Sequence, residues 1–572
     1  MAYRLNVKIG GPAGSGIFTL GETVAKILKY SGLWVYCSTD YPSLIKGGHN
    51  QYAVHASDKK IYSSICPVDI LVCLDKKTAE LHAPEIHPGG ALIYDSSFIK
   101  DLQIKNKKVV LVPIPMTELA KQIGSSVYAS SIAFGAVCGL IRVESEFASK
   151  LIHHQFDKKG PEIVKHNLES FNKGIELSKH KNLGLNFKTV KDYHRIMLDG
   201  NMAISLGAIK AGCKFISAYP MTPATSIIQN IAAQEMEYNI IAKQTEDEIS
   251  AINMALGAAF TGVRSMTATS GGGFSLMVEA FGMAGMAEVP LVVVESQRAG
   301  PSTGLPTYTS QGDLRFVQHA SQGEFPRIII APGDVEECFT ETFNAFNLAE
   351  IYQTPVIILS DKELSNSIMT VERFQDKGMK IKRGKLLSDS EVNSGYMRYK
   401  FTKDGISPRC LPGQPNGMHV ASSYEHDETG YTSEEADMHA MQIDKRARKL
   451  DNLYDKIEGV SVYGNKNPDI QLIIWGSTKG ACIDALDMLN ALKIKVKIIQ
   501  VKYICPFPVK QFLKIFNPKF PTLLLEHNKS GQLRGIIREN TGILISNYYG
   551  KYDARPICPE LVVEQVRKVL KK

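Results

Sequence analysis

The first stretch whose residues could do chemistry is the loop that contains Thr222. The sequence Tyr-Pro-Met-Thr-Pro at 219–223 follows a short apolar run and precedes a segment with helical spacing, so the order is strand, loop, helix. The two prolines fix φ and remove two amide donors, which leaves Thr222 free to face a ligand. We expect a helix over 225–237, capped by Thr225 or Ser226. A helix N-terminus behind a threonine suits a carboxylate, and an ordinary capped turn is the alternative.

Glu248 is the second candidate, because it stands at the start of an apolar helix. The run 249–259 consists of small and apolar residues, and it predicts a helix that is packed on most faces. A carboxylate at this position would be poorly solvated, which raises its pKa and suits it to passing a proton. A surface residue that compensates the helix dipole is the alternative.

Two further loops follow later strands of the same segment. Thr269 ends a strand expected over 264–269 and leads into Gly271, where a ligand or a partner backbone could approach closely. Arg298 follows a strand expected over 291–295, and its fork of donors suits a carboxylate. In open α/β sheets, ligands bind at the carboxyl ends of such strands. A tight turn at Gly271 and a surface salt bridge at Arg298 are the alternatives.

The N-terminal segment carries a different glycine pattern. A strand expected over 5–9 opens onto Gly11, Gly14 and Gly16, and a helix expected over 17–30 follows. Backbone amides and a helix N-terminus hold phosphate in this arrangement. The spacing departs from G-x-G-x-x-G and no clear ribose-binding acid ends the second strand, so a nicotinamide site is not favoured.

A second anion-binding loop is expected over 40–50. It combines a proline with Lys46, Gly47, Gly48 and His49, and it could clamp a second anionic group beside the first glycine loop. Two flexible loops without a ligand are the alternative.

Length and composition bound the class of protein. With 572 residues, of which 44% are hydrophobic and 22% charged, the chain predicts a soluble protein of three or four domains. The formal charge of +8 is spread among acidic residues, so nothing favours a nucleic-acid partner. None of the ten cysteines stands in a C-x-x-C pair, so we expect no metal or iron–sulfur site in this chain. No export segment and no run of 18 apolar residues occurs, which favours the cytoplasm and no membrane.

Together these motifs resemble a known family. The stretches 219–223, 267–273 and 295–298, with Glu248 and its helix, resemble the pyrimidine-binding domain of 2-oxoacid:ferredoxin oxidoreductases. The domain order resembles the fused gamma-alpha chain of the 2-oxoglutarate enzyme. The resemblance implies an α/β, multidomain protein with doubly wound sheets. Its expected parts are a Rossmann-like gamma domain that is associated with CoA (1–182), a thiamine-diphosphate pyrimidine-binding domain (194–375), an irregular connector (376–462) and a transketolase C-terminal-like domain (463–572).

The resemblance also implies a reaction and roles. The reaction is CoA-dependent oxidative decarboxylation, with 2-oxoglutarate converted to succinyl-CoA. A pyruvate, branched-chain or aryl-pyruvate enzyme is one alternative, and a non-catalytic CoA- or nucleotide-binding module is another. Glu248 matches the acid that hydrogen-bonds the cofactor pyrimidine, and Thr222 and Arg298 match the residues that hold the substrate carboxylate. The further expected contacts are Tyr219, Pro220, Thr269 and Gly271 with the cofactor, and Gly11, Gly14, Gly16, Lys46, Gly47 and Gly48 with CoA.

What the chain lacks implies a partner. No Gly-Asp-Gly stretch and no cluster-binding cysteine set occurs. The resemblance therefore implies a beta subunit that shares thiamine diphosphate and carries Mg²⁺ and a [4Fe–4S] cluster. Ferredoxin is the expected electron acceptor, and a dimer of heterodimers is the expected assembly. The interface would bury on the order of 2,000 Å² or more.

Overall fold

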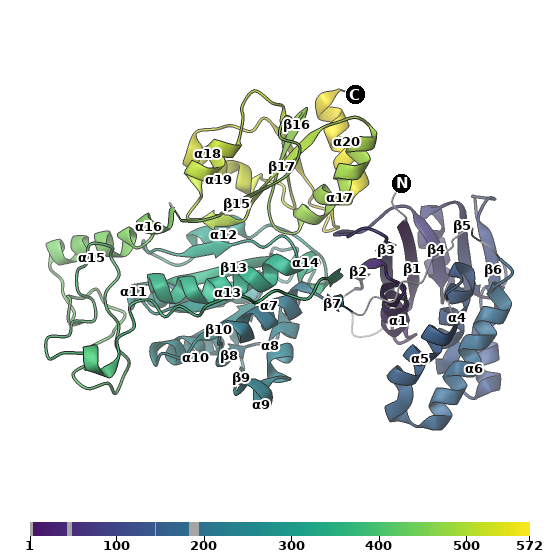
Figure 1. Cartoon of the computed structure of the whole chain (residues 1–572), viewed down its shortest axis with the longest axis horizontal. Helices are drawn as coiled ribbons and strands as arrows, with labels where there is room; N and C mark the ends of the chain where they lie inside the picture. The colour runs from purple at the N-terminus through teal and green to yellow at the C-terminus, as the bar shows by residue number, and fades with distance from the viewer. Residues whose placement is uncertain are drawn as a thin grey trace. The chain divides into compact units, whose positions relative to one another are not determined.

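The computed structural model describes residues 4–42, 48–143, 145–181, 183, 194–454 and 456–571 (Figure 1). Lys46 and Gly47 therefore lie outside the described residues. The chain forms two compact units. The first unit comprises Met1–Leu198, Ser367–Arg373 and Cys558–Glu560, and the second comprises Asp199–Asn366, Phe374–Ile557 and Leu561–Lys572. Among the described residues, no helix is both long and apolar enough to span a bilayer.

The first unit is built on an eight-stranded mixed sheet, counted over the described residues. In sheet order its strands are β6 (Val110–Ile114), β5 (Ile86–Asp95), β4 (Val68–Cys73), β1 (Arg4–Pro12), β3 (His49–Ser57), β2 (Trp34–Asp40), β14 (Ile368–Val371) and β7 (Ile196–Leu198). The helices are α1 (Ile17–Tyr30), α2 (Lys76–His82), α3 (Met116–Ile123), α4 (Ala129–Ile141), α5 (Ser145–Phe156) and α6 (Pro161–Ser178), and η1 (Ala83–Glu85) is a short 3₁₀ turn. The helix expected over 17–30 is thus confirmed.

Strand β1 is longer than the sequence predicts. Its alternate residues Leu5, Val7 and Ile9 are fully buried in the apolar core of this unit. The antiparallel partner β3 then extends the ladder through Gly11 to Pro12, which pairs with His49. The prediction that the strand ends before the glycine loop was therefore wrong, because β3 supplies hydrogen-bond partners that lie about 40 residues away in the sequence.

The second unit contains a seven-stranded sheet, counted over the described residues. Its order is β18 (Tyr503–Cys505), β12 (Ile328–Ile330), β13 (Pro355–Asp361), β11 (Leu291–Gln297), β10 (Ser265–Thr269), β8 (Phe215–Ala218) and β9 (Ile241–Gln244). All pairs are parallel except β12 with β18. The accompanying helices are α7 (Gly200–Lys210), α8 (Thr225–Ala232), α9 (Glu235–Tyr238), α10 (Glu248–Phe260), α11 (Gly271–Met286), α12 (Leu314–His319), α13 (Val335–Tyr352) and α14 (Lys362–Asn366).

The structure corrects local details here. The helix expected over 225–237 is two helices, and Ala224 rather than Thr225 or Ser226 is its N-cap. The Ser226 hydroxyl is engaged elsewhere, since it accepts a hydrogen bond from the Asn201 side chain. Strand β9 begins at Ile241, after Asn239 takes a left-handed conformation that ends α9.

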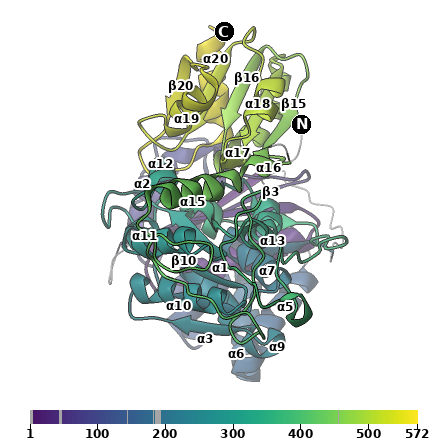
Figure 2. The same ribbon diagram turned by 90° about the vertical axis from the view of Figure 1, so that its left-hand side faces the viewer.

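A five-stranded sheet, again counted over the described residues, completes the second unit. Its order is β15 (Val460–Gly464), β17 (Val496–Val501), β16 (Ile470–Ile474), β19 (Thr522–Glu526) and β20 (Asn547–Gly550). The helices in this part of the chain are α15 (Ala436–Arg448), α16 (Asp451–Tyr454), α17 (Thr478–Ala491), α18 (Val509–Ile515), α19 (Gln532–Thr541) and α20 (Pro559–Leu570). In Figure 2, α15 is turned toward the viewer and lies above α11.

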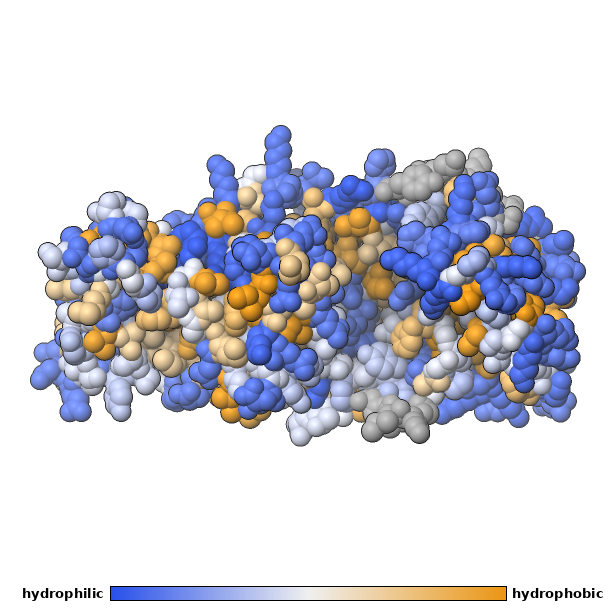
Figure 3. Space-filling model, turned by 90° about the horizontal axis from the view of Figure 1, so that it is seen from below, coloured by the Kyte–Doolittle hydropathy of each residue, from blue (hydrophilic) through white to orange (hydrophobic). Residues whose placement is uncertain are grey.

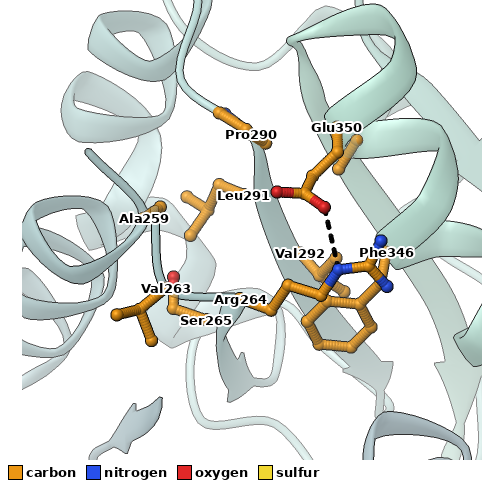
Figure 4. A pocket seen from close by; sticks show the side chains of 10 residues that line it. Ala259, Val263, Arg264, Ser265, Pro290, Leu291, Val292, Phe346 and Glu350 are labelled. Atoms are coloured by element: carbon orange, nitrogen blue, oxygen red, sulfur yellow. Dashed lines mark hydrogen bonds and ion pairs between the residues drawn. The ribbon is translucent and has the colours of Figure 1, made fainter. Parts of the chain in front are cut away.

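Buried ion pairs fasten the irregular segment before β15 to the seven-stranded layer. The Glu350 carboxylate on α13 forms ion pairs with Arg264, Arg383 and Arg409, and Figure 4 shows the Arg264 contact. On α15 and just beyond it, Lys445 and Lys449 contact the buried Glu288 carboxylate. The segment is therefore attached by charge as well as by apolar contact, although it has little regular structure.

Candidate active site

The predicted site residues of the second unit lie along one edge of the seven-stranded sheet. Strands β8, β10 and β11 are parallel neighbours, so their carboxyl ends meet at the same edge. Thr222 follows β8, Gly271 follows β10, and Arg298 follows β11 directly. Glu248 stands four residues beyond the end of β9, at the first position of α10. The topology thus brings together residues from loops that are separated by up to 76 positions.

Glu248 is buried, because it is only 3% exposed. The helix dipole is met by its neighbour, since the Asp247 side chain is the N-cap and accepts from the Ser250 amide at 2.7 Å. Oε1 of Glu248 is shielded from solvent and has no hydrogen-bond partner among the described residues. The alternative of a dipole-compensating surface residue is therefore wrong.

The environment of Glu248 favours its protonated form. Burial is the largest effect and raises the pKa of the carboxyl, and the neighbouring Asp247 charge raises it further. A backbone hydrogen bond and the charge of Arg298 act in the opposite direction without reversing the shift. A buried carboxyl with a raised pKa and a free oxygen can exchange a proton with a ligand.

The glycine turn after β10 leaves room for the Glu248 side chain. A Cβ atom on Gly273 would lie 2.6 Å from Oε1 of Glu248 and 2.1 Å from Oγ1 of Thr269. Thr269 in turn contacts the Met221 sulfur at 3.8 Å. The loop after β8, the end of β10 and the start of α10 therefore converge at this point.

Arg298 is tied directly to the Thr222 loop. Its Nη1 donates a 2.8 Å hydrogen bond to the Thr222 carbonyl oxygen. Burial lowers the pKa of the guanidinium, while the carboxyl groups of Asp313, Glu248 and Glu295 oppose this effect. Only part of the donor fork is used in this contact, so the remaining donors can receive an anion.

Sequence reasoning missed a second acidic group behind Arg298. Glu295 is completely buried, and neither of its carboxylate oxygens has an N–H or O–H donor among the described residues. Its polar neighbour is the Asp313 carboxyl, and two such groups can only be in hydrogen-bond contact if one holds a proton. Burial and the neighbouring acids raise the pKa of Glu295 well above its usual range, and burial raises the pKa of Asp313 to about 6.

Asp313 also explains Gly271. A Cβ atom at Gly271 would lie 2.5 Å from Oδ2 of Asp313, so the close approach expected at this glycine is made by a side chain of the same chain. The Asp313 amide donates to Oε1 of Gln297 at 3.0 Å, which holds its loop against the end of β11. Every residue of β11 is buried, so the strand shows no alternation of apolar and polar residues. Glu295 could therefore not be recognised from the sequence pattern.

The remaining predicted residues are placed as follows. Tyr219 and Pro220 follow β8, which ends at Ala218, and Tyr219 is exposed. In the first unit Gly11 lies in β1, whereas Gly14 and Gly16 have left-handed φ angles of 85° and 79°. Gly48 has a φ of 87°.

One group of side chains among the described residues could ligate a metal ion. Cys66, Cys558 and Glu560, in the first unit, place their ligand atoms within 4.8 Å of one another. Glu248, Arg298 and the Glu295–Asp313 pair belong to the second unit, so this group is not part of the candidate site.

Comparisons with known proteins identify the family. Residues 206–447 match the family model described as "Pyruvate flavodoxin/ferredoxin oxidoreductase, thiamine diP-bdg", and residues 6–177 match "Pyruvate ferredoxin/flavodoxin oxidoreductase". The 2-oxoacid:ferredoxin oxidoreductase subunit alpha of Saccharolobus solfataricus is 33% identical over 100% of this chain and 98% of its own. The 2-oxoglutarate synthase subunit KorA of Methanothermobacter marburgensis is 34% identical over 60% of this chain and 91% of its own.

A solved structure agrees over the whole chain. It is a 2-oxoglutarate:ferredoxin oxidoreductase from Magnetococcus marinus with 2-oxoglutarate, coenzyme A and succinyl-CoA bound. It superimposes with a TM-score of 0.93 at 35% identity and covers 99% of both chains. The multidomain α/β class expected from the sequence is confirmed. This chain therefore belongs to the 2-oxoacid:ferredoxin oxidoreductases, as an alpha subunit of that oxidoreductase family.

Proposed function

We propose that the second unit supplies the pyrimidine-binding half of a thiamine diphosphate site. The observation that carries the proposal is the free Oε1 of Glu248, a buried carboxyl oxygen beside the glycine turn 271–273. The donor set fits an aminopyrimidine, since a carboxyl with a raised pKa can hold a proton toward a ring nitrogen. Tyr219 and Pro220 after β8, with Thr269 and Gly271 at the end of β10, are the proposed cofactor contacts.

The residues of this chain have distinct roles. When bound, thiamine diphosphate supplies the nucleophilic carbon for attack on the oxo group and stores the electrons left by decarboxylation. Glu248 hydrogen-bonds the pyrimidine nitrogen and exchanges a proton there. Arg298 and Thr222 bind the substrate carboxylate and orient the oxo group. The hydrogen bond between them keeps the guanidinium at the edge of the site before substrate arrives.

The substrate we propose is 2-oxoglutarate, with succinyl-CoA as the product. The support is the Magnetococcus marinus structure, which has both compounds bound, together with the KorA relative. Pyruvate, a branched-chain oxoacid and an aryl pyruvate are the competing substrates. A panel of these oxoacids, assayed in the assembled complex with CoA and a low-potential acceptor, tests this choice.

The first unit, within residues 1–182, is proposed to hold CoA. Gly14 and Gly16 precede the N-terminus of the 14-residue helix α1, where free amides attract phosphate. Gly11, Lys46, Gly47 and Gly48 complete the proposed set. The expected positive charge of Lys46 would reinforce anion binding.

A beta subunit is proposed to complete the cofactor site. It would carry Mg²⁺, the diphosphate contacts and a [4Fe–4S] cluster, pass electrons to ferredoxin, and form a dimer of heterodimers with this chain. The support is a set of exposed apolar side chains on the second unit, namely Met236, Ile241, Ile249, Met254 and Leu276. Figure 3 shows apolar surface, in orange, on this unit. Exposed apolar residues that gather on one face mark an interaction surface.

The direct experiment measures activation of the cofactor. In the assembled complex, Glu248→Gln and Glu248→Ala should abolish the enzyme-dependent exchange of the thiazolium C2 proton for deuterium. Glu246→Gln is the matched control, because Glu246 is exposed and its Oε1 accepts a hydrogen bond from the Ser250 hydroxyl. An unchanged exchange rate in both Glu248 variants would refute the proposed role.

A further inference from the structure

Four side chains, those of His49, His82, Glu85 and Lys8, form a continuous hydrogen-bonded relay beside the glycine loop of the first unit. Nε2 of His49 lies 2.9 Å from Nε2 of His82, and Nδ1 of His82 lies 2.6 Å from Oε1 of Glu85. Lys8 donates to the other oxygen of Glu85. The order is therefore His49, His82, Glu85, Lys8, from β3 through the end of α2 and η1 to β1.

The relay lies next to the glycine loop that follows β1. Lys8, Gly10 and Pro12 alternate along β1 and so share one face of the sheet, and His49 pairs with Pro12 in the ladder. A Cβ atom on Gly10 would lie 3.0 Å from Cε1 of His49, so the missing side chain lets the imidazole lie against the strand. The histidine end of the relay thus lies where β1 passes into the turn before α1.

The geometry couples the two imidazoles through one proton. An Nε2-to-Nε2 contact needs one hydrogen between the rings, and the Nδ1–H of His82 is used by Glu85. If His82 is an imidazolium, it donates to His49, whose own proton then stands on Nδ1. If His82 is neutral, it accepts from His49, and Nδ1 of His49 becomes an acceptor. One proton on His82 therefore decides whether Nδ1 of His49 donates or accepts.

Nδ1 of His49 is the free end of the relay. This atom is shielded from solvent and has no hydrogen-bond partner among the described residues. Burial and then the charge of His82 lower the pKa of His49, and Lys77 acts in the same direction, whereas Asp75 and Asp40 oppose them. The surroundings of His49 therefore disfavour an extra proton on its own ring.

At the other end of the relay, the Glu85 carboxylate stays charged. Burial works against ionisation of Glu85, but His82 and Lys8 hold its pKa below the usual range. An ionised Glu85 stabilises an imidazolium at His82 and fixes the ring through Nδ1.

We propose that His49, His82 and Glu85 form a proton-linked anion-binding element, in which His82 holds a proton so that Nδ1–H of His49 donates to a phosphate oxygen of a nucleotide diphosphate. The inference rests on the proposed CoA function of this unit and adds a pH dependence to it. Gly14 leaves space for such a ligand, since a Cβ there would meet no atom within 4 Å in the part of the chain that the structure describes. The helix α1 behind it has no side-chain cap, so its first amides can share the same anion.

The test measures proton uptake during binding. The assembled complex is titrated with dephospho-CoA by calorimetry at pH 6.5 and 8.0, in two buffers of different ionisation enthalpy. Dephospho-CoA is the probe because it keeps the diphosphate but lacks the 3′-phosphate, which itself titrates near neutral pH. The wild-type complex should take up as much as one proton per ligand at pH 8.0. Its affinity should fall as pH rises, by at most about 10-fold per pH unit for one linked proton.

Two variants assign the uptake to the relay. His82→Asn, checked for an unchanged thermal unfolding temperature, should abolish proton uptake and make the affinity independent of pH. His166→Asn is the matched control, because His166 belongs to the same unit and contacts Tyr128 instead. Uptake that is absent in the wild type, or that persists in His82→Asn, overturns the relay.

A third variant separates this inference from the proposed function. Gly14→Asp places a negative charge in the open space of the loop, at a left-handed position that aspartate tolerates. Weaker dephospho-CoA binding in this variant supports a ligand at the loop. If binding is unchanged by Gly14→Asp, both the CoA assignment and the relay fail. If Gly14→Asp weakens binding but His82→Asn leaves proton uptake intact, only the relay fails.

Discussion

Oε1 of Glu248 lies 2.6 Å from the point where a Cβ atom on Gly273 would stand, so the carboxylate occupies the space of the side chain that Gly273 lacks. Gly273 belongs to the first turn of α11, where its φ is not left-handed, and so backbone freedom is not the reason for glycine here. The reason is the close approach of an acid from α10. The position of Glu248 therefore depends on the absence of a side chain at Gly273.

Gly273→Ala should displace the Glu248 carboxylate without unfolding the chain. The added methyl group must move either Glu248 or Thr269, and a displacement of about 1 Å costs on the order of 100-fold in a reaction that depends on geometry. We expect exchange of the thiazolium C2 proton to fall by roughly that factor in the assembled complex. Gly272→Ala controls for the fold, since its Cβ would meet no atom of the described residues within 4 Å. Exchange at the wild-type rate in Gly273→Ala would show that the contact is not tight.

Glu295→Gln should change how stability depends on pH. The folded pKa of Glu295 is raised, so the folded protein keeps a proton that the unfolded chain releases above the ordinary glutamate pKa. Stability is therefore lost as pH rises from that value toward the folded pKa, at up to about 1.4 kcal/mol per unit. Glutamine cannot ionise and can still donate to Asp313, so the variant should lose this dependence. Denaturant unfolding at pH 5, 6 and 7 measures the slope, and equal slopes in both proteins would contradict the assignment.

Local patterns in the sequence predicted much of the second unit. The apolar runs and glycine turns predicted β10 and β11 to within two residues at each end, and Glu248 was placed correctly at the first position of α10. These features depend on neighbours in the sequence, which is why the pattern suffices.

Contacts between distant residues were not predictable in this way. Asp313 lies against Gly271 across 42 positions, and β14 joins the sheet of the first unit more than 300 residues after β2. The helix α10 was expected to be packed on most faces, but Ile249 and Met254 are exposed, since apolar patterning does not distinguish a core from an interface. The link between Thr222 and Arg298 likewise needed the fold to bring two loops together.

Arg298→Lys should weaken oxoacid binding and preserve the fold. Arginine can donate to the Thr222 carbonyl with one nitrogen and to a carboxylate with the others, whereas lysine is a single point donor. Loss of a charged hydrogen bond is worth about 1.5–3 kcal/mol, so we expect KM for the oxoacid to rise about 10- to 100-fold. Arg315→Lys is the control, because Arg315 pairs with Glu539 at an exposed position. An unchanged KM would count against a substrate contact at Arg298.

Glu350→Gln should destabilise the second unit strongly. Its carboxylate is the shared partner of Arg264, Arg383 and Arg409, two of which are almost fully buried. Removing the charge leaves buried guanidinium groups without compensation, which costs about 3–5 kcal/mol in comparable cases. Denaturant unfolding measures the loss. Asp376→Asn, which removes an exposed ion pair with Lys210, should cost far less, because solvent screens that pair. Similar losses in both variants would mean that the buried cluster is not important for stability.

Ile249→Glu should weaken association with the proposed beta subunit and leave this chain folded. Ile249 is 50% exposed on α10 and shares its exposed face with Met254, so a charge there disturbs no core contact of this chain. If the face is covered by a partner, the glutamate would be desolvated without a counter-charge, a cost of several kcal/mol that would lower the affinity by on the order of 100-fold or more. Leu492→Glu, also about half exposed but C-terminal to α17, is the matched control. Co-purification and sedimentation of the co-expressed subunits measure assembly, and undiminished assembly of Ile249→Glu would remove α10 from the interface.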